Sequence, residues 1–207
     1  MAMKNAGFEA AASAMIEKGL GIGKEKALKL FFELMQEYGW EYNLIFQRFV
    51  ERVNEKINYK ILAAGIIAYR YAQKKYIKPY DKVIPTLKEL KSNGIKIGIV
   101  SDAPRLKAWM RLTELKLEDM FDVVVAYGDV RERKPSNMPF KKALKELGLN
   151  AEDVLMVGDM PEKDIKGAKA MGIKTCFAKY GCTLKNIQVN ADYEIKDISE
   201  LIDIIKK

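Results

Sequence analysis

The chain has 207 residues, of which 49% are hydrophobic, and none of its apolar runs approaches the ~18 residues that a membrane-spanning helix needs. It contains no histidine, which excludes Ser–His triads, histidine general bases and histidine metal ligands. The net charge is +8, yet lysines alternate with acids along the predicted helices, so we expect neither a nucleic-acid nor a membrane partner. The only cysteines, Cys176 and Cys182, predict no disulfide framework and favour a cytoplasmic location.

Residues 4–78 show helical periodicity only, and we predict a helical domain there. The expected helices cover residues 4–20, 24–39, 41–57 and 59–75. The GLGIG segment at 19–23 has no strand before it, which favours a helix end and loop over a nucleotide-binding motif. The aromatic side chains of Tyr42, Phe46, Tyr69 and Tyr71 are expected in the core rather than in contact with a ligand.

From Pro79 onward, strand and helix patterns alternate, which predicts an α/β fold with a Rossmann-like, doubly wound parallel sheet over residues 79–207. Strand patterns occupy residues 95–102, 121–129, 154–159 and 174–181, and helix patterns occupy 83–94, 103–115, 136–149, 162–172 and 198–207. The apolar run Val154–Val157 predicts a strand buried on both faces. In such a sheet, ligands bind at the carboxyl ends of the strands.

Polar side chains follow three of these strands. Ser101 and Asp102 end the first, a loop with Lys134 follows the second, and Asp159 ends the third, with Asp164 five residues later. We expect all of them at one edge of the sheet, because the ends of parallel strands meet there. Separately, a serine before a helix is usually a cap and acids near a helix start are common. Together they favour a shared site.

The chemistry of this set suits a phosphate and a divalent cation. Ser101 can donate to a phosphoryl oxygen, and the Lys134 ammonium can neutralise phosphate charge. Asp159 and Asp164 supply the oxygen ligands that Mg²⁺ prefers. Arg105 and Lys107 lie close in sequence, but a solvated helix face explains them better.

The segments IGIVSD, RKPSNMPFKKALKELGL and VGDMPEKD together resemble the second, third and fourth motifs of the haloacid dehalogenase-like hydrolase superfamily. The similarity points to its capped phosphatase branch, which includes archaeal glyceraldehyde 3-phosphate phosphatases. It implies that residues 4–78 are a helical cap and 79–207 a Rossmann-like core. It also implies the site roles: phosphate binding by Ser101, Asp102 and Lys134, catalysis by Lys134 and Asp159, and Mg²⁺ binding by Asp159 and Asp164.

One family feature has no match in this sequence. The first motif, Asp-x-Asp on a central strand, supplies the nucleophile of the family's aspartyl-phosphate mechanism. We therefore expect a chain without the central strand that is inactive on its own, either a truncated protein or an inactive relative, unless another segment or a partner's strand fills the gap. Two neighbouring strands would lose ladder partners, and each unsatisfied buried backbone group costs about 1–3 kcal/mol.

The leading prediction is a Mg²⁺-dependent phosphatase of a small phosphorylated metabolite, because a helical cap limits access by large polymers. The alternative is a non-catalytic module that binds Mg²⁺ and phosphorylated ligands, which the absent Asp-x-Asp favours. A metal-independent 2-haloacid dehalogenase is less favoured, because it has no use for the pair Asp159 and Asp164. An unfilled sheet also favours self-association.

Overall fold

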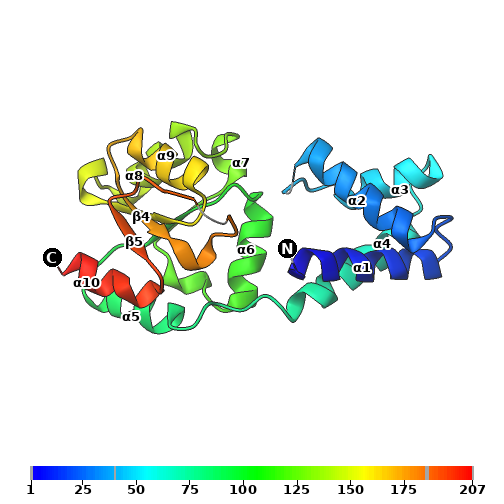
Figure 1. The fold of residues 1–207 in the computed structure, drawn as a ribbon, viewed down its shortest axis with the longest axis horizontal. Helices are drawn as coiled ribbons and strands as arrows, with labels where there is room; N and C mark the ends of the chain where they lie inside the picture. Colours follow the sequence, from blue (N-terminus) through cyan, green and yellow to red (C-terminus); the bar gives the residue numbers. More distant parts are fainter. Residues whose placement is uncertain (1, 40, 185–186, 207) are drawn as a thin grey trace. The chain divides into compact units, whose positions relative to one another are not determined.

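The structure is a computed structural model that describes residues 2–39, 41–184 and 187–206. It consists of two compact units, Met1–Lys78 and Pro79–Lys207 (Figure 1). Each unit has its own hydrophobic core. Among the residues described, no helix has the length and apolar character required to cross a membrane.

The first unit is made of helices. They are α1 (Ala2–Glu17), α2 (Lys24–Tyr38), α3 (Ile45–Asn54) and α4 (Tyr59–Lys74). The predicted helices are confirmed, although α3 is shorter than the expected 41–57. It ends at Asn54 and is followed by Glu55, whose φ of 59° is left-handed. The GLGIG segment forms the predicted loop, in which Gly19 takes a φ of +97°.

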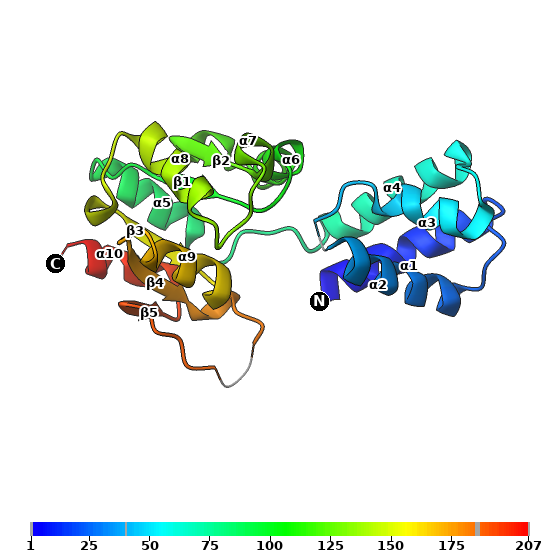
Figure 2. The same ribbon diagram turned by 90° about the horizontal axis from the view of Figure 1, so that it is seen from above.

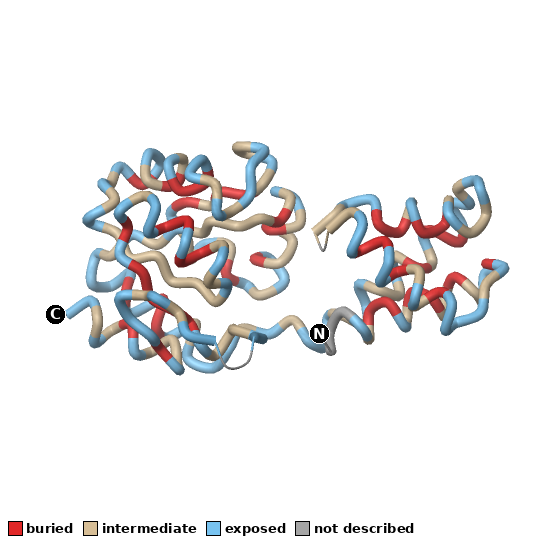
Figure 3. Tube along the Cα trace, turned by 45° about the horizontal axis from the view of Figure 1, so that its top comes forward, coloured by how far each residue is buried: buried red, intermediate tan, exposed pale blue. Residues whose placement is uncertain are grey.

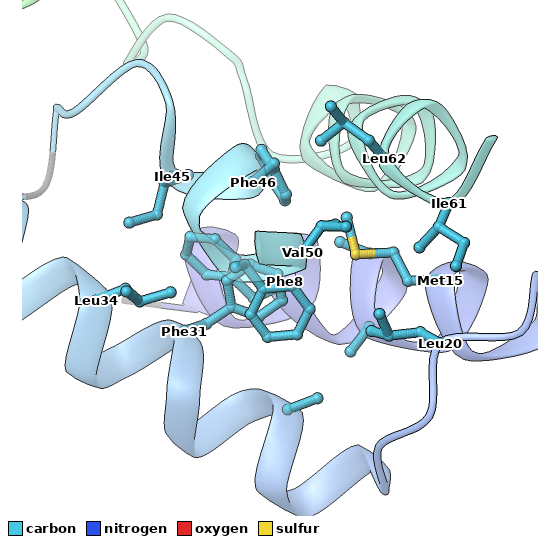
Figure 4. Close-up of a cluster of buried hydrophobic side chains, with 14 of the residues drawn as sticks. Phe8, Met15, Leu20, Phe31, Leu34, Ile45, Phe46, Val50, Ile61 and Leu62 are labelled. Atoms are coloured by element: carbon cyan, nitrogen blue, oxygen red, sulfur yellow. The ribbon is translucent and has the colours of Figure 1, made fainter. Parts of the chain in front are cut away.

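Aromatic side chains fill the core of this unit (Figure 4). The rings of Phe31 and Phe49 stack with centroids 3.7 Å apart. The expected core positions of Phe46 and Tyr69 are confirmed, since Phe46 is buried and Tyr69 packs against the cluster. The same expectation for Tyr71 is wrong: Tyr71 is 73% exposed. Two residues turn an α-helix by about 200°, so Tyr69 and Tyr71 lie on opposite sides of α4.

The second unit alternates strands with helices. Its strands are β1 (Gly98–Val100), β2 (Val123–Val125), β3 (Leu155–Gly158), β4 (Lys174–Ala178) and β5 (Tyr193–Ile195). Its α-helices are α5 (Val83–Ser92), α6 (Arg105–Leu115), α7 (Tyr127–Val130), α8 (Asn137–Leu147), α9 (Lys166–Lys169) and α10 (Leu201–Ile205). The helix expected at 162–172 is divided into a π-helical turn, η3 (Pro161–Ile165), and α9. Short 3₁₀ turns are η1 (Glu118–Met120), η2 (Ala151–Asp153), η4 (Lys179–Gly181) and η5 (Ile198–Glu200).

Helices cover both faces of the parallel strands, as the predicted α/β fold requires. Val123 and Val125 pack with α8 on one face of β2, whereas Val124 belongs to the cluster formed by α5 and α6 on the other. In β4, Cys176 packs with Leu201 of α10. This alternation is the pattern of a strand buried between two helical layers.

The parallel strands form two separate sheets rather than one. β1 pairs with β2, while β3, β4 and β5 pair in that order (Figure 2). In the described part of the chain, β1 therefore has a strand on one side only, and so does β3.

The two strands with this free edge are less buried than predicted. No residue of β1 or β3 is fully buried, whereas β4 is buried from Thr175 to Ala178 (Figure 3). The expectation that Val154–Val157 is buried on both faces is confirmed only in part. Leu155 and Val157 pack against one cluster and Val154 and Met156 against another, but all four are half-buried. A strand in the centre of a sheet has a neighbouring strand on each side, whereas β3 pairs only with β4 in the described chain and is therefore less covered.

Helix α8 packs against both sheets. Its residues Ala143 and Leu147 belong to the cluster over β1 and β2, and Phe140 and Leu144 belong to the cluster with β3 and α9. The contact with α9 is close, because a Cβ at Gly167 would lie 2.5 Å from the Phe140 ring. Helical packing, not strand pairing, thus joins the two sheets.

Candidate active site

Ser101 lies directly after β1, at the carboxyl edge of its sheet. Its N–H donates to the carbonyl of Val125 at 2.8 Å, which continues the ladder between β1 and β2. Its Oγ accepts a hydrogen bond from the N–H of Ala103 at 3.2 Å. The hydroxyl thus stands just before α6, and its own proton can be donated to a ligand.

Lys134 connects the ends of the two sheets. It belongs to the loop between α7 and α8, and its side chain is only 12% exposed. The ammonium donates to the carbonyl of Val100, the last residue of β1, at 2.8 Å. It also lies 2.7 Å from Oδ1 of Asp164, which follows β3. The predicted meeting of a lysine and a carboxylate at the strand ends is observed.

The two aspartates occupy distinct environments after β3. Asp164 has a side chain 5% exposed, and its Oδ2 accepts a hydrogen bond from the N–H of Met160 at 3.0 Å. Gly158 permits this position, because a Cβ there would lie 2.4 Å from the Cβ of Asp164. Burial, and next the negative charge of Asp164, raise the pKa of Asp159 above its usual value.

Asp102 binds two segments at once. Its Oδ1 accepts the backbone N–H of Lys134 at 2.9 Å, and its Oδ2 lies 2.8 Å from the ammonium of Lys163. Lys163 is not among the site residues predicted from the sequence. Its position directly before Asp164 could have indicated a site residue. Its neighbours Glu162 and Lys166, however, give the segment the pattern of an ordinary solvent-exposed helix face.

The other basic residues considered near the site have different surroundings. Arg105 is mostly exposed and forms an ion pair with Asp129 at the start of α7, in keeping with a solvated helix face. Lys107 is half-buried.

The acidic pair fits a hard divalent cation. Mg²⁺ is commonly held by one or two carboxylates, with waters and substrate phosphates completing its shell. Asp159 and Asp164 supply such a pair, and the raised pKa of Asp159 indicates a carboxylate whose charge is incompletely compensated. Within the described residues, no group of three or more Asp, Glu, Cys or His side chains is arranged to hold a metal ion.

Comparison with known proteins identifies the family. The model of the haloacid dehalogenase-like hydrolases matches residues 3–178. The chain belongs to this family. Its resemblance to these hydrolases, noted from the motifs, is therefore confirmed, as are the Rossmann-like α/β fold and the enzyme class, a hydrolase of the phosphatase type.

Several relatives of this haloacid dehalogenase-like hydrolase have named activities. A glyceraldehyde 3-phosphate phosphatase of Methanocaldococcus jannaschii is 35% identical over 198 residues, which are 95% of this chain and 86% of that protein. One of Pyrococcus furiosus is 33% identical over 196 residues, 93% and 82% of the two chains. The crystal structure of a HAD phosphatase from Thermococcus onnurineus superposes with a TM-score of 0.73 at 30% identity, covering 96% of this chain and 87% of that one.

Proposed function

We propose that this hydrolase is the binding and metal-holding part of a Mg²⁺-dependent phosphatase for a small phosphorylated metabolite. The observation that carries the proposal is the position of the Lys134 ammonium, 2.8 Å from the last carbonyl of β1 and 2.7 Å from the Asp164 carboxylate. At this position the ammonium can pair with a bound phosphate and with the metal-binding carboxylate at the same time.

Each site residue has a role in this proposal. Ser101 and the backbone N–H groups at the start of α6 bind the phosphoryl oxygens, and Lys134 balances their charge. Asp159 and Asp164 hold Mg²⁺, which supplies Lewis-acid polarisation of a phosphoryl oxygen when bound. Asp102 and Lys134 also bring the loop before α8 up to the end of β1.

The nucleophile is the part of the proposal that the described residues do not supply. We place it on an additional parallel strand that pairs with the free edges of β1 and β3 and ends in Asp-x-Asp. Two features support this position. Both edges lack a strand partner in the described chain, and the side chain of Lys134 already reaches from the end of β1 to the segment after β3.

The relatives and the helical unit support a substrate class for this proposal. Proteins of 35% and 33% identity are named glyceraldehyde 3-phosphate phosphatases, which makes this triose phosphate the first substrate to assay. We also propose that the helical unit, Met1–Lys78, is the cap that selects among small phosphorylated metabolites. Self-association and the cytoplasmic location remain predictions.

A second function is a non-catalytic module that binds Mg²⁺ and a phosphorylated ligand without turnover. The observation in its favour is that the given sequence contains no Asp-x-Asp that could supply the nucleophile. A metal-independent dehalogenase is less favoured, because it would not need Asp159 and Asp164.

The decisive experiment measures Mg²⁺-dependent phosphate release from an aryl phosphate and from glyceraldehyde 3-phosphate. Two proteins are compared: the 207-residue chain, and the same chain extended at its N-terminus by an apolar strand that ends in Asp-x-Asp. We expect turnover from the extended protein alone, and its loss in Asp159→Asn. The matched control carries Asn in place of the first Asp of the added strand.

Two results would contradict the proposal. Turnover by the 207-residue chain that Asp159→Asn abolishes would mean that the chain contains its own nucleophile, so the added strand would be unnecessary. An extended protein that binds Mg²⁺ and phosphate but never hydrolyses an ester would favour the non-catalytic module.

A further inference from the structure

The carboxylate of Asp102 is fully engaged by protein groups. One oxygen accepts the backbone N–H of Lys134 at 2.9 Å, and the other lies 2.8 Å from the Lys163 ammonium. The side chain is only 13% exposed. A buried carboxylate with both oxygens occupied would repel a phosphate rather than bind it, so a direct contact between this side chain and the substrate is disfavoured.

The contacts of Asp102 belong to a closed ring of interactions at the site, which we call the circuit. Asp102 holds the backbone of Lys134, the ammonium of Lys134 pairs with Asp164, and Lys163, the residue before Asp164, returns to Asp102. Two ammonium groups and two carboxylates alternate along this path. The charges within it therefore balance. Asp159 is not part of this circuit, and burial and then the negative charge of Asp164 raise its pKa.

The circuit lies where strand pairing is missing. Asp102 follows β1 by two residues, and Lys163 belongs to η3, which begins three residues after β3. β1 and β3 do not pair with each other in the described chain. In the described chain no ladder joins the two sheets, so the distance between Lys134 and the acids after β3 depends on the packing of α8 against both sheets and on the side-chain contacts at this edge.

We propose that Asp102 and Lys163 are positioning residues of the phosphate and metal site. Asp102 fixes the backbone of Lys134, and the ion pair with Lys163 draws η3, with Asp164, toward the end of β1. We call the contacts of Asp102 with Lys134 and Lys163 the clamp. The site binds phosphate and Mg²⁺ together only while the clamp keeps the Lys134 ammonium next to the Asp164 carboxylate. This role rests on the proposed function, since it concerns the same site.

Three substitutions separate the two arms of the clamp, and a fourth tests rescue. Lys163→Met removes the ion pair and leaves the bond from the Lys134 N–H to Asp102. Asp102→Asn keeps a neutral acceptor for that N–H but removes the charge that Lys163 pairs with. Asp102→Ala removes both contacts, so its effect should be the largest of the three. Lys163→Arg keeps a cation and should restore most of what Lys163→Met loses.

The first measurement needs no ligand. The rate of reductive methylation at Lys163, read by peptide mass spectrometry, should rise in Asp102→Asn, because the amine loses its ion-pair partner. The second measurement is the affinity for inorganic phosphate in the presence of Mg²⁺, by titration calorimetry. We expect about a tenfold loss in Asp102→Ala, with smaller losses in Asp102→Asn and Lys163→Met. The control is Lys166→Met, which breaks an exposed ion pair with Glu162 nearby.

The outcomes distinguish the inference from the function it rests on. If the unsubstituted protein binds neither phosphate nor Mg²⁺, the proposed function fails, and the positioning role with it. If it binds both, and the Asp102 and Lys163 variants bind equally well while methylation at Lys163 rises, the clamp exists but positions nothing. If Lys163→Arg fails to rescue while its thermal unfolding matches the unsubstituted protein, the charge of residue 163 is not what positions the site.

Discussion

At the scale of single residues, Asp159 bears a charge that its surroundings disfavour. Burial and the neighbouring Asp164 carboxylate both raise its pKa, and a Cβ at Gly181 would approach its side chain to 2.9 Å. The folded protein therefore binds the proton of this carboxyl more tightly than the unfolded chain does. A bound cation would relieve the same penalty, which is why an acid with a raised pKa suits a metal ligand.

Asp159→Asn should stabilise the protein at neutral pH when no Mg²⁺ is present. A raised folded-state pKa means that the penalty is absent below the ordinary carboxyl pKa of about 3.9, grows as the pH rises to the folded-state value, and is constant above it. The gain in urea midpoint should thus be larger at pH 7 than at pH 4. An equal gain at both pH values would show that charge is not the cause. The exposed Asp203→Asn is the control.

At the scale of elements, the turn after β3 brings the two aspartates together. The sequence predicted one helix from 162, whereas η3 is π-helical and passes into α9 only at Lys166. This turn folds Asp164 back over Gly158, where its Oδ2 accepts the Met160 N–H. A π-helical turn at a functional site is common.

Gly158→Ala should displace Asp164. The added methyl group would lie 2.4 Å from the Asp164 Cβ, so either the turn or β3 must move. Overpacking of this kind costs about 1–3 kcal/mol of stability. We expect a lower unfolding free energy and weaker Mg²⁺ binding by calorimetry. Gly21→Ala is a matched control, because a Cβ at Gly21 meets nothing within 4 Å. Unchanged Mg²⁺ affinity in Gly158→Ala would remove Asp164 from the proposed metal site.

At the scale of the whole molecule, the chain has two units whose cores share no residue. The helical unit packs its aromatic cluster around Phe8 and Phe31, and the α/β unit has separate clusters over each sheet. Units with their own cores can unfold separately.

Phe31→Ala should therefore destabilise the helical unit alone. Phe31 is 1% exposed and stacks on Phe49, so its truncation costs about 3–5 kcal/mol. Hydrogen exchange followed by mass spectrometry should show faster exchange in α1–α4 and unchanged protection in β4. Tyr71→Ala, at a residue 73% exposed, is the control. Faster exchange in both units would show that they unfold as one.

The sequence by itself determined most of the order of helices and strands and the family motifs, because periodicity, turn residues and short spacings are local. It missed α7, which begins within the strand expected at 121–129, and β5. Ser101, Lys134, Asp159 and Asp164 could be chosen for the same reason. Only the tertiary structure decided that Asp102 binds Lys134 and Lys163, residues 32 and 61 positions away. It also decided that β3 is half-buried and that Tyr71 is exposed. These outcomes depend on contacts between segments that are distant in the sequence. A local sequence pattern does not specify which segment will pack against a given strand edge or helix face.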